Sequence, residues 1–235
     1  MLTLRGGVFP RLIVFFPVLF PFYLVRGNFF GIPVTLPEVL MTFVFIYFLI
    51  RERPNYREFL VWPVLMILMA GIISVLISPA LAAFVDGTAF YGQTRALGIF
   101  KGWIFFPIIY FYTARYYFRE KPGLILSALR ALVISGLLLS FYALYQVFTQ
   151  SYITADMRAS GPFESANYLA LYLGPILVYC LTALFKKDAN FWDRIFLGFS
   201  VFICAAALYF TKSYAAWIAV FCAIYFYRAK LLRQA

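Results

Sequence analysis

The sequence predicts an all-α, polytopic membrane protein: a transmembrane helix bundle of about eight spans with both termini in the cytoplasm. Hydrophobic residues make up 65% of the 235 residues and charged residues 12%, whereas a soluble domain has roughly 45–50% apolar and about 25% charged residues. Apolar segments close to the ~20 residues of a membrane-spanning helix recur along the chain. Connecting segments that are rich in Lys and Arg alternate along the chain with connecting segments that have few. We expect residues 1–235 to form a single integral-membrane domain.

Eight apolar segments define the predicted spans. Pro17 and Pro21 interrupt the first, which predicts a tilted, kinked or re-entrant helix. No small-residue cleavage site follows a short apolar core, so we expect an uncleaved first span. The spans are Leu12–Val25, Val34–Ile50, Phe59–Ile77, Leu97–Tyr117, Leu124–Phe148, Ser165–Phe185, Ile195–Thr211 and Tyr214–Tyr227.

The distribution of Lys and Arg predicts the orientation in the membrane. Cytoplasmic segments carry an excess of basic residues, and 15 of the 20 basic residues fall on the side that holds the termini. The net charge of +11 therefore indicates cytoplasmic loops, and we expect no nucleic-acid partner. The predicted outer face keeps the other five, which are Arg26, Arg95, Lys101, Arg158 and Lys212.

Cysteine and histidine usage excludes several kinds of site. Cys180, Cys204 and Cys222 all lie in predicted spans, and their number and spacing fit neither a disulfide framework nor a metal site. The chain has no His, which removes the commonest general base and metal ligand. We expect no metal and no cofactor.

Small residues recur at four-residue spacing on two predicted spans. Such residues let helix backbones approach closely in lipid. Both spans are therefore expected in the bundle interior, through Ala166, Ala170 and Gly174 on the sixth and Ala215, Ala219 and Ala223 on the eighth.

Four of the outer-face cations are candidates for an anion site, because basic residues there oppose the insertion bias. Arg95 ends the predicted long outer loop Ser78–Gly98, and Lys101 lies at the mouth of the fourth span. Arg158 precedes the sixth span, and Lys212 lies in the turn before the eighth. Arg and Lys are the usual partners of phosphate and diphosphate oxygens.

Two other roles for these cations remain open. They can bind lipid headgroups, or they can pair locally with acidic residues. The local pairs would join Arg95 to Asp86, and Arg158 to Asp156 or Glu164.

The stretch "RASGPFESANYLALYL", Arg158–Leu173, leads from a polar loop into a span. Gly161 and Pro162 predict a bend, and Ser165 is placed to cap the following helix. Asn167 then lies in the first helical turn, where free backbone N–H groups favour an anion. The alternative is that Asn167 only caps the helix or bonds a neighbouring helix.

This stretch resembles a segment of the O-antigen ligase and polymerase family that reads approximately R-x-x-G-x-F-x-x-x-N-x-x-A. A second family signature, roughly T-x-S-R-G-x-W, resembles "TKSYAAW", Thr211–Trp217. Tyr214 and Ala215 replace the Arg and Gly of that signature, and Lys212 is a candidate for the missing cation. The residues that match are Arg158, Gly161, Phe163, Asn167 and Ala170 in the first motif, and Thr211, Ser213 and Trp217 in the second.

The resemblance implies a membrane glycosyltransferase that moves a glycan from a polyprenyl-diphosphate carrier at the outer face of a prokaryotic cytoplasmic membrane, in cell-envelope polysaccharide assembly. Its partners would be membrane lipid and the polyprenyl-diphosphate-linked glycan. Arg158, Lys212 and Arg95 would contact the diphosphate and Asn167 would orient Arg158, with Lys101 and Tyr214 also assigned to the substrate site.

The chain departs from the family in length and in lacking His. Family members carry a further outer loop with a His implicated in catalysis, so we expect either an N-terminal portion or a non-catalytic relative. Two alternatives remain: a transporter or flippase for a lipid-linked or anionic solute, and a non-catalytic membrane module.

Overall fold

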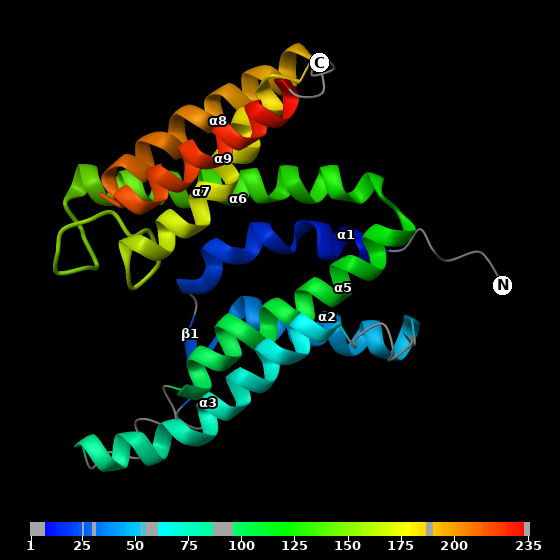
Figure 1. Ribbon diagram of the computed structural model, residues 1–235, viewed down its shortest axis with the longest axis vertical. Coiled ribbons are helices and arrows are strands. Elements are labelled where there is room, and N and C mark those ends of the chain that lie inside the picture. Colours follow the sequence, from blue (N-terminus) through cyan, green and yellow to red (C-terminus); the bar gives the residue numbers. More distant parts are fainter. Residues whose placement is uncertain are drawn as a thin grey trace. The chain divides into compact units, whose positions relative to one another are not determined.

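The computed structural model is built mainly of α-helices (Figure 1). It describes residues 8–24, 26–29, 32–52, 54, 61–86, 96–186 and 190–232. The prediction of a helical fold is therefore confirmed. One small antiparallel pair of strands, absent from the predicted architecture, adds to it.

Four helices in the described ranges are long and apolar enough to cross a membrane: 96–120, α6 (Gly123–Thr149), α7 (Ala166–Leu184) and α8 (Phe191–Phe210). Shorter apolar helical stretches cover Pro10–Leu19, Trp62–Ile77 and Tyr214–Ala229. These lengths and compositions indicate a helical membrane protein. The count of about eight spans and the cytoplasmic termini stay predictions.

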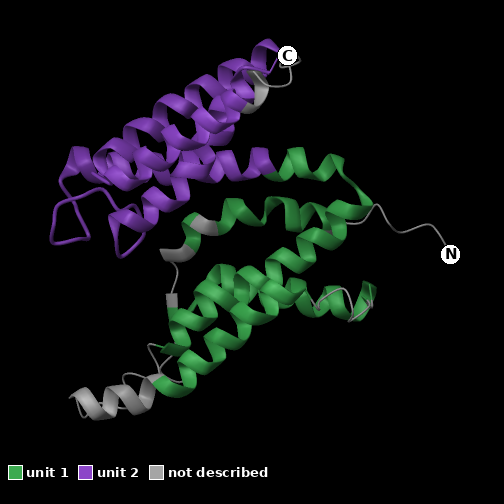
Figure 2. Ribbon diagram, in the orientation of Figure 1, with its two compact units in different colours: residues 1–128 green, residues 129–235 purple. Residues whose placement is uncertain are grey.

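The chain divides into two compact units, residues 1–128 and residues 129–235 (Figure 2). We call them unit 1 and unit 2 and describe each by itself. The single integral-membrane domain expected from the sequence stays a prediction.

Unit 1 begins with two short helical segments and a hairpin. The α-helix α1 (Val8–Phe15) gives way to the 3₁₀ helix η1 (Phe16–Leu24), in keeping with the predicted interruption by Pro17 and Pro21, since proline cannot donate an α-helical hydrogen bond. Strands β1 (Arg26–Phe29) and β2 (Ile32–Thr35) then pair antiparallel, with Arg26 opposite Thr35.

The remaining helices of unit 1 are longer. They are α2 (Leu36–Glu52), α3 (Trp62–Asp86) and a helix over residues 96–120 that contains a π-helical turn η3 (Lys101–Phe105) followed by α5 (Phe106–Glu120). The predicted outer loop Ser78–Gly98 is wrong at both ends, because α3 continues to Asp86 and helix resumes at Ala96. Helix-favouring Leu and Ala residues follow Pro79 in the sequence and allow this extension.

Unit 2 is a bundle of α6 from Leu129 onward, α7, α8 and α9 (Tyr214–Leu232). Its core includes Leu139, Leu173, Cys204 and Leu208, all fully or almost fully buried. Gly136 permits the contact of α6 with α7, because a Cβ there would lie 2.8 Å from Ile176 Cδ1. The close approach of these helices therefore depends on a residue without a side chain.

The two predicted small-residue faces differ in outcome. On α7 the prediction is confirmed, since Ala166, Ala170 and Gly174 are buried. On α9 it is wrong, since Ala215 and Ala219 are exposed and Ala223 is half-buried. The buried side of α9 instead presents Val220, with Ala216, Trp217 and Ile224 packed against the core. Val220, Trp217 and Ile224 bury more apolar area than Ala215, Ala219 and Ala223 would.

Candidate functional site

The loop between α6 and α7 and the turn between α8 and α9 meet at one end of unit 2 (Figure 1). The backbone N–H of Ala159 in the loop donates to the carbonyl of Phe210, the last residue of α8, at 3.2 Å. This bond joins the two segments that carry the sequence motifs. It therefore brings Arg158, from the first motif, next to Thr211 from the second.

Left-handed backbone is concentrated at this same end of unit 2. Across the described ranges, positive φ occurs at Gln150 (53°), Met157 (51°), Gly161 (59°) and Lys212 (52°). The predicted bend at Gly161 is thus made with a conformation that suits glycine. A non-glycine residue in this conformation costs roughly 1–2 kcal/mol, and such residues cluster at functional sites.

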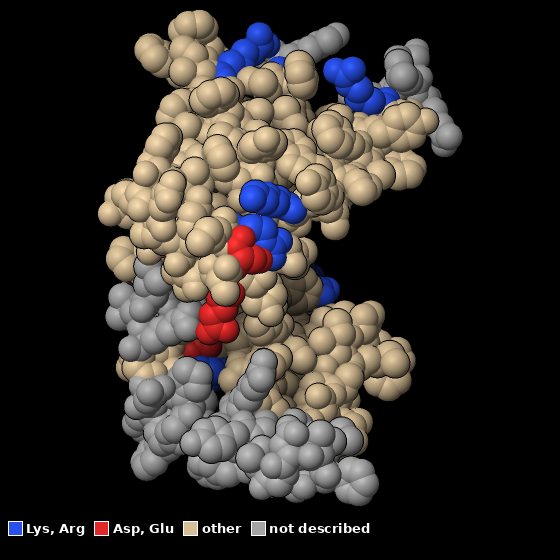
Figure 3. Space-filling view, turned by 90° about the vertical axis from the view of Figure 1, so that its left-hand side faces the viewer, with Lys and Arg blue, Asp and Glu red and all other residues tan. Residues whose placement is uncertain are grey.

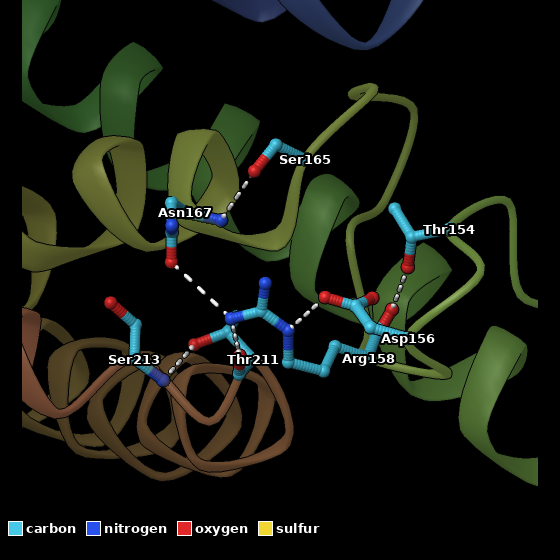
Figure 4. A network of polar contacts seen from close by, with 7 residues as sticks. All are labelled: Thr154, Asp156, Arg158, Ser165, Asn167, Thr211 and Ser213. Atoms are coloured by element: carbon cyan, nitrogen blue, oxygen red, sulfur yellow. Dashed lines mark hydrogen bonds and ion pairs between the residues drawn. The ribbon is translucent and has the colours of Figure 1, made fainter.

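The Arg158 guanidinium lies among side chains and carbonyls from three segments (Figure 4). Its Nε lies 2.5 Å from Asp156 Oδ2. Its Nη1 lies 3.4 Å from Asn167 Oδ1 and 3.5 Å from the Thr211 carbonyl oxygen. The ion pair is tight and the two Nη1 bonds are long, while Nη2 makes no hydrogen bond or ion pair with the residues that the structure describes. An incoming anion can therefore be met by Nη2 and by part of Nη1.

Asp156 is a charged neighbour of this guanidinium and is itself supported. A hydrogen bond from the Thr154 hydroxyl and the ion pair with Arg158 lower the pKa of the Asp156 carboxyl. The same hydroxyl lies 3.1 Å from the Arg158 carbonyl oxygen, to which it can donate. Of the two local pairs considered for Arg158, the one with Asp156 is confirmed.

Ser165 caps α7 as predicted. Its Oγ accepts the backbone N–H of Asn167 at 3.3 Å, and its backbone is extended, as is usual for an N-cap residue. The exposed Asn167 side chain is then free to face Arg158 across the loop (Figure 4). Asn167 therefore accepts from the guanidinium instead of capping the helix.

The second motif supplies backbone and a buried hydroxyl. Thr211 is fully buried, and its Oγ1 accepts the backbone N–H of Ser213 at 3.3 Å. Lys212 is exposed, and Tyr214 is 80% exposed. Among the described residues, neither of these two side chains has a hydrogen bond or ion pair with Arg158. The structure thus brings Arg158, Asn167 and the Thr211 carbonyl together and leaves Lys212 and Tyr214 at the edge.

Lys101 lies in unit 1, in the first residue of the π-helical turn η3. Its Nζ is 2.7 Å from Glu38 Oε2 in the first turn of α2. The same carboxylate oxygen accepts the backbone N–H of Thr35 at 2.8 Å, which is one of the two bonds of a capping box. Lys101 is therefore committed to an interhelical ion pair, and Arg95 lies outside the described residues.

Unit 1 also has an apolar groove of about 560 Å³. Of its lining side chains only that of Tyr47 carries a polar atom, so the groove lacks the cations that a phosphate requires. The lining residues are Leu12, Phe16, Leu19, Leu40, Phe43, Val44, Ile46, Tyr47 and Ile50.

Charged side chains occupy small areas of the face drawn in Figure 3, where basic and acidic residues lie in contact within a surface of other residues. A second arginine ion pair in unit 2 joins Arg130 Nη2 to both oxygens of Asp193, at 3.0 and 3.2 Å. In the described part of the chain, no group of three or more His, Cys, Asp or Glu residues could hold a metal ion.

Gln146, a buried amide near the end of α6, contacts the loop and is not among the residues predicted from the sequence. A signal was present, since Gln146 is an uncharged polar residue within the otherwise apolar stretch Tyr142–Phe148. Polar groups are seldom buried without a hydrogen-bond partner, so its position predicted a specific contact.

No protein-family model, no curated protein and no solved structure matches this chain.

Proposed function

We propose that this chain is an O-antigen ligase-like membrane glycosyltransferase, or part of one, that binds the diphosphate of a polyprenyl-linked glycan through Arg158. The proposed place is the outer face of a prokaryotic cytoplasmic membrane, in cell-envelope polysaccharide assembly. One observation supports it above others: the Arg158 guanidinium lies 3.4 Å from Asn167 Oδ1 and 3.5 Å from the Thr211 carbonyl oxygen. Residues from both motifs of the resemblance thus meet at one cation.

The chemistry of the donor fits this arrangement. Glycan transfer from a diphosphate carrier releases a diphosphate, and a cation that neutralises its developing charge stabilises the transition state. Arg158 offers Nη2 and part of Nη1 to the phosphate oxygens, while Asn167 and the Thr211 carbonyl orient the guanidinium plane. Lys212 is an exposed cation next to Thr211 and can meet a second phosphate.

Asp156 is poorly suited to be the general base. Hydrogen bonding from Thr154 and the ion pair with Arg158 lower its pKa, and a carboxylate with a lowered pKa is a weaker proton acceptor. The chain has no His. We therefore assign this end of unit 2 to donor binding and not to proton transfer.

The test compares two arginines of unit 2 that both pair with an aspartate. Purified protein in lipid nanodiscs is titrated with farnesyl diphosphate, a short isoprenoid diphosphate, by calorimetry. We expect Arg158→Ala to weaken binding by about 10- to 100-fold, the value of one or two charge-assisted hydrogen bonds. The control Arg130→Ala removes the ion pair with Asp193 and should leave the affinity unchanged.

Equal loss in both variants, or no binding by the unmodified protein, would contradict the proposal. A transfer assay with an undecaprenyl-diphosphate-linked glycan then separates an enzyme from a non-catalytic module. Binding that depends on Arg158 without any transfer would favour the module.

A further inference from the structure

Gln146 is a fully buried amide one turn before the end of α6. Its carboxamide makes three hydrogen bonds, all to backbone groups of the loop that carries Arg158. Nε2 donates to the Gly161 carbonyl at 2.8 Å. Oε1 accepts the N–H of Gly161 at 2.8 Å and the N–H of Ser160 at 3.3 Å. The side chain thus satisfies three buried backbone groups that have turned away from regular structure.

The two ends of the amide are matched to different partners. Oε1 faces two N–H donors and Nε2 faces a carbonyl. If Oε1 and Nε2 exchanged places, the NH₂ group would face the two N–H donors and Oε1 would face the carbonyl oxygen, and no hydrogen bond could form. This pattern holds Gly161 in its left-handed conformation, with φ of 59°. Gln146 therefore fixes a particular shape of the loop and does more than fill space.

The held segment is directly coupled to Arg158. Ser160 and Gly161 are bonded by Gln146, Ala159 by the Phe210 carbonyl, and the Arg158 carbonyl by Thr154. Few backbone torsions remain between these bonds and the Cα of Arg158, from which the side chain extends. The position of the Arg158 side chain is consequently set from α6 as well as from α8.

We propose that Gln146 is a positioning residue for the anion site, which holds Arg158 against Asn167 and Thr211 through the backbone of Ser160 and Gly161. The proposal rests on the proposed function for the identity of the anion, an isoprenoid diphosphate. Gln146 itself touches no ligand, because it is buried beneath the loop.

The first experiment tests the loop without ligand. Hydrogen–deuterium exchange of peptides that cover residues 150–165 is compared between the unmodified protein, Gln146→Leu and Ser140→Ala. Ser140 is a buried polar residue of the same helix, and its hydroxyl donates a hydrogen bond to Cys204 Sγ at 3.6 Å and to no loop residue that the structure describes. We expect Gln146→Leu to speed exchange of the Ser160 and Gly161 amides about tenfold or more, because both lose a buried acceptor. Unchanged exchange, or an equal increase in Ser140→Ala, would overturn the proposal.

The second experiment tests the link to Arg158 in a double-mutant cycle with farnesyl diphosphate. Gln146→Leu alone should weaken binding about tenfold, whereas in the Arg158→Ala background it should have no further effect, since it acts through the missing side chain. Independent, multiplying losses would overturn the positioning role. If the unmodified protein binds no diphosphate, the proposed function fails, and the exchange measurement still decides whether Gln146 positions the loop.

A conservative variant supplies a pH-dependent readout. In Gln146→Glu a charged carboxylate keeps the two acceptor bonds but faces the Gly161 carbonyl without a proton to donate. Protonation restores the donor, so the affinity of this variant relative to the unmodified protein should rise as the pH falls. A ratio that stays constant or falls with acidification would contradict the need for a donor at this position.

Discussion

Two of the candidate cations form ion pairs of opposite character. Lys101 pairs with Glu38 in unit 1, and Arg158 pairs with Asp156 in unit 2. Glu38 is 63 residues from Lys101 in the sequence, and the side chains are 11% and 21% exposed, so the pair ties α2 to the helix over residues 96–120. Asp156 is two residues from Arg158, and these side chains are 46% and 26% exposed. The first pair links helices, and the second belongs to a loop open to solvent.

The difference shows that a cation on the predicted outer face is not sufficient to indicate a ligand site. Lys101 places its compact charge on one carboxylate that a backbone N–H also supports. Arg158 distributes its charge over several N–H groups, and Asp156 uses only the Nε side. The guanidinium can therefore hold an internal acid and still receive an external anion.

Substitution of Lys101 should give the largest change and act on stability. Lys101→Ala leaves Glu38 partly buried without its cation, which we expect to cost about 2 kcal/mol, between the values for exposed and buried pairs. The thermal midpoint in detergent should fall by roughly 4–8 °C. The double variant Lys101→Ala/Glu38→Gln should recover part of this loss, and the exposed Lys186→Ala should change nothing. A normal midpoint combined with lost diphosphate binding would show that Lys101 is a ligand.

Asp156→Asn should act on binding in the opposite direction to Arg158→Ala. Removal of the internal acid should strengthen farnesyl diphosphate binding about tenfold, because the anion no longer meets a like charge beside the guanidinium. Glu164→Gln, another acid of the same loop, is the control and should have little effect. Unchanged or weaker binding in Asp156→Asn would show that the carboxylate helps to form the site.

The lowered pKa of Asp156 fixes the pH range of this effect. The hydrogen bond from Thr154 and the ion pair with Arg158 favour the charged carboxylate. The contribution of the pair is present above the unfolded pKa and is lost only as the pH falls through the lowered folded pKa. The affinity ratio of Asp156→Asn to the unmodified protein should thus stay above one between about pH 5 and 8, because Asp156 stays charged there. Titration of the diphosphate changes the size of this ratio because it changes the charge of the ligand, but only protonation of Asp156 would bring the ratio to one. A ratio of one within this window would therefore contradict the pKa shift.

Asn167→Ala should give the smallest effect on binding. Its contact with Arg158 is long, at 3.4 Å, so we expect calorimetry to show a two- to fivefold loss. Ser165→Ala should have the complementary result, a loss of about 1 kcal/mol in stability from the helix cap with little change in affinity. If both variants lose affinity to the same degree, the helix cap and not the amide side chain is what the site requires.

The sequence was sufficient for features that depend on local patterns. Apolar length predicted the four long helices, and Ser165 before an apolar run predicted the cap of α7. The small residues of α7 also lie where the pattern predicted. On α9 the same pattern failed because the helix is apolar on all sides, so spacing alone did not reveal which face packs.

Features that depend on distant residues could not be read in this way. The ion pair of Lys101 with Glu38 spans 63 residues, and the bond from Ala159 to Phe210 joins the loop before α7 to the end of α8. Gln146 was a visible signal, but its partners are backbone groups whose positions follow from the left-handed Gly161. The hairpin of β1 and β2 was missed because most of its residues lie in the predicted connection between the spans Leu12–Val25 and Val34–Ile50.

The π-helical turn at Lys101–Phe105 contains one residue more than a regular α-helical turn would, within the helix over residues 96–120. Each residue of an α-helix advances the direction of a side chain by about 100°. Deleting one residue from this turn would therefore leave Ile109 and Tyr112 packed as they are while rotating everything before it, and Lys101 would no longer point toward Glu38. The extra residue rotates the part of the helix before the turn relative to the part after it. Each part can then direct its side chains toward its own neighbours, which lie at different angles around the helix axis.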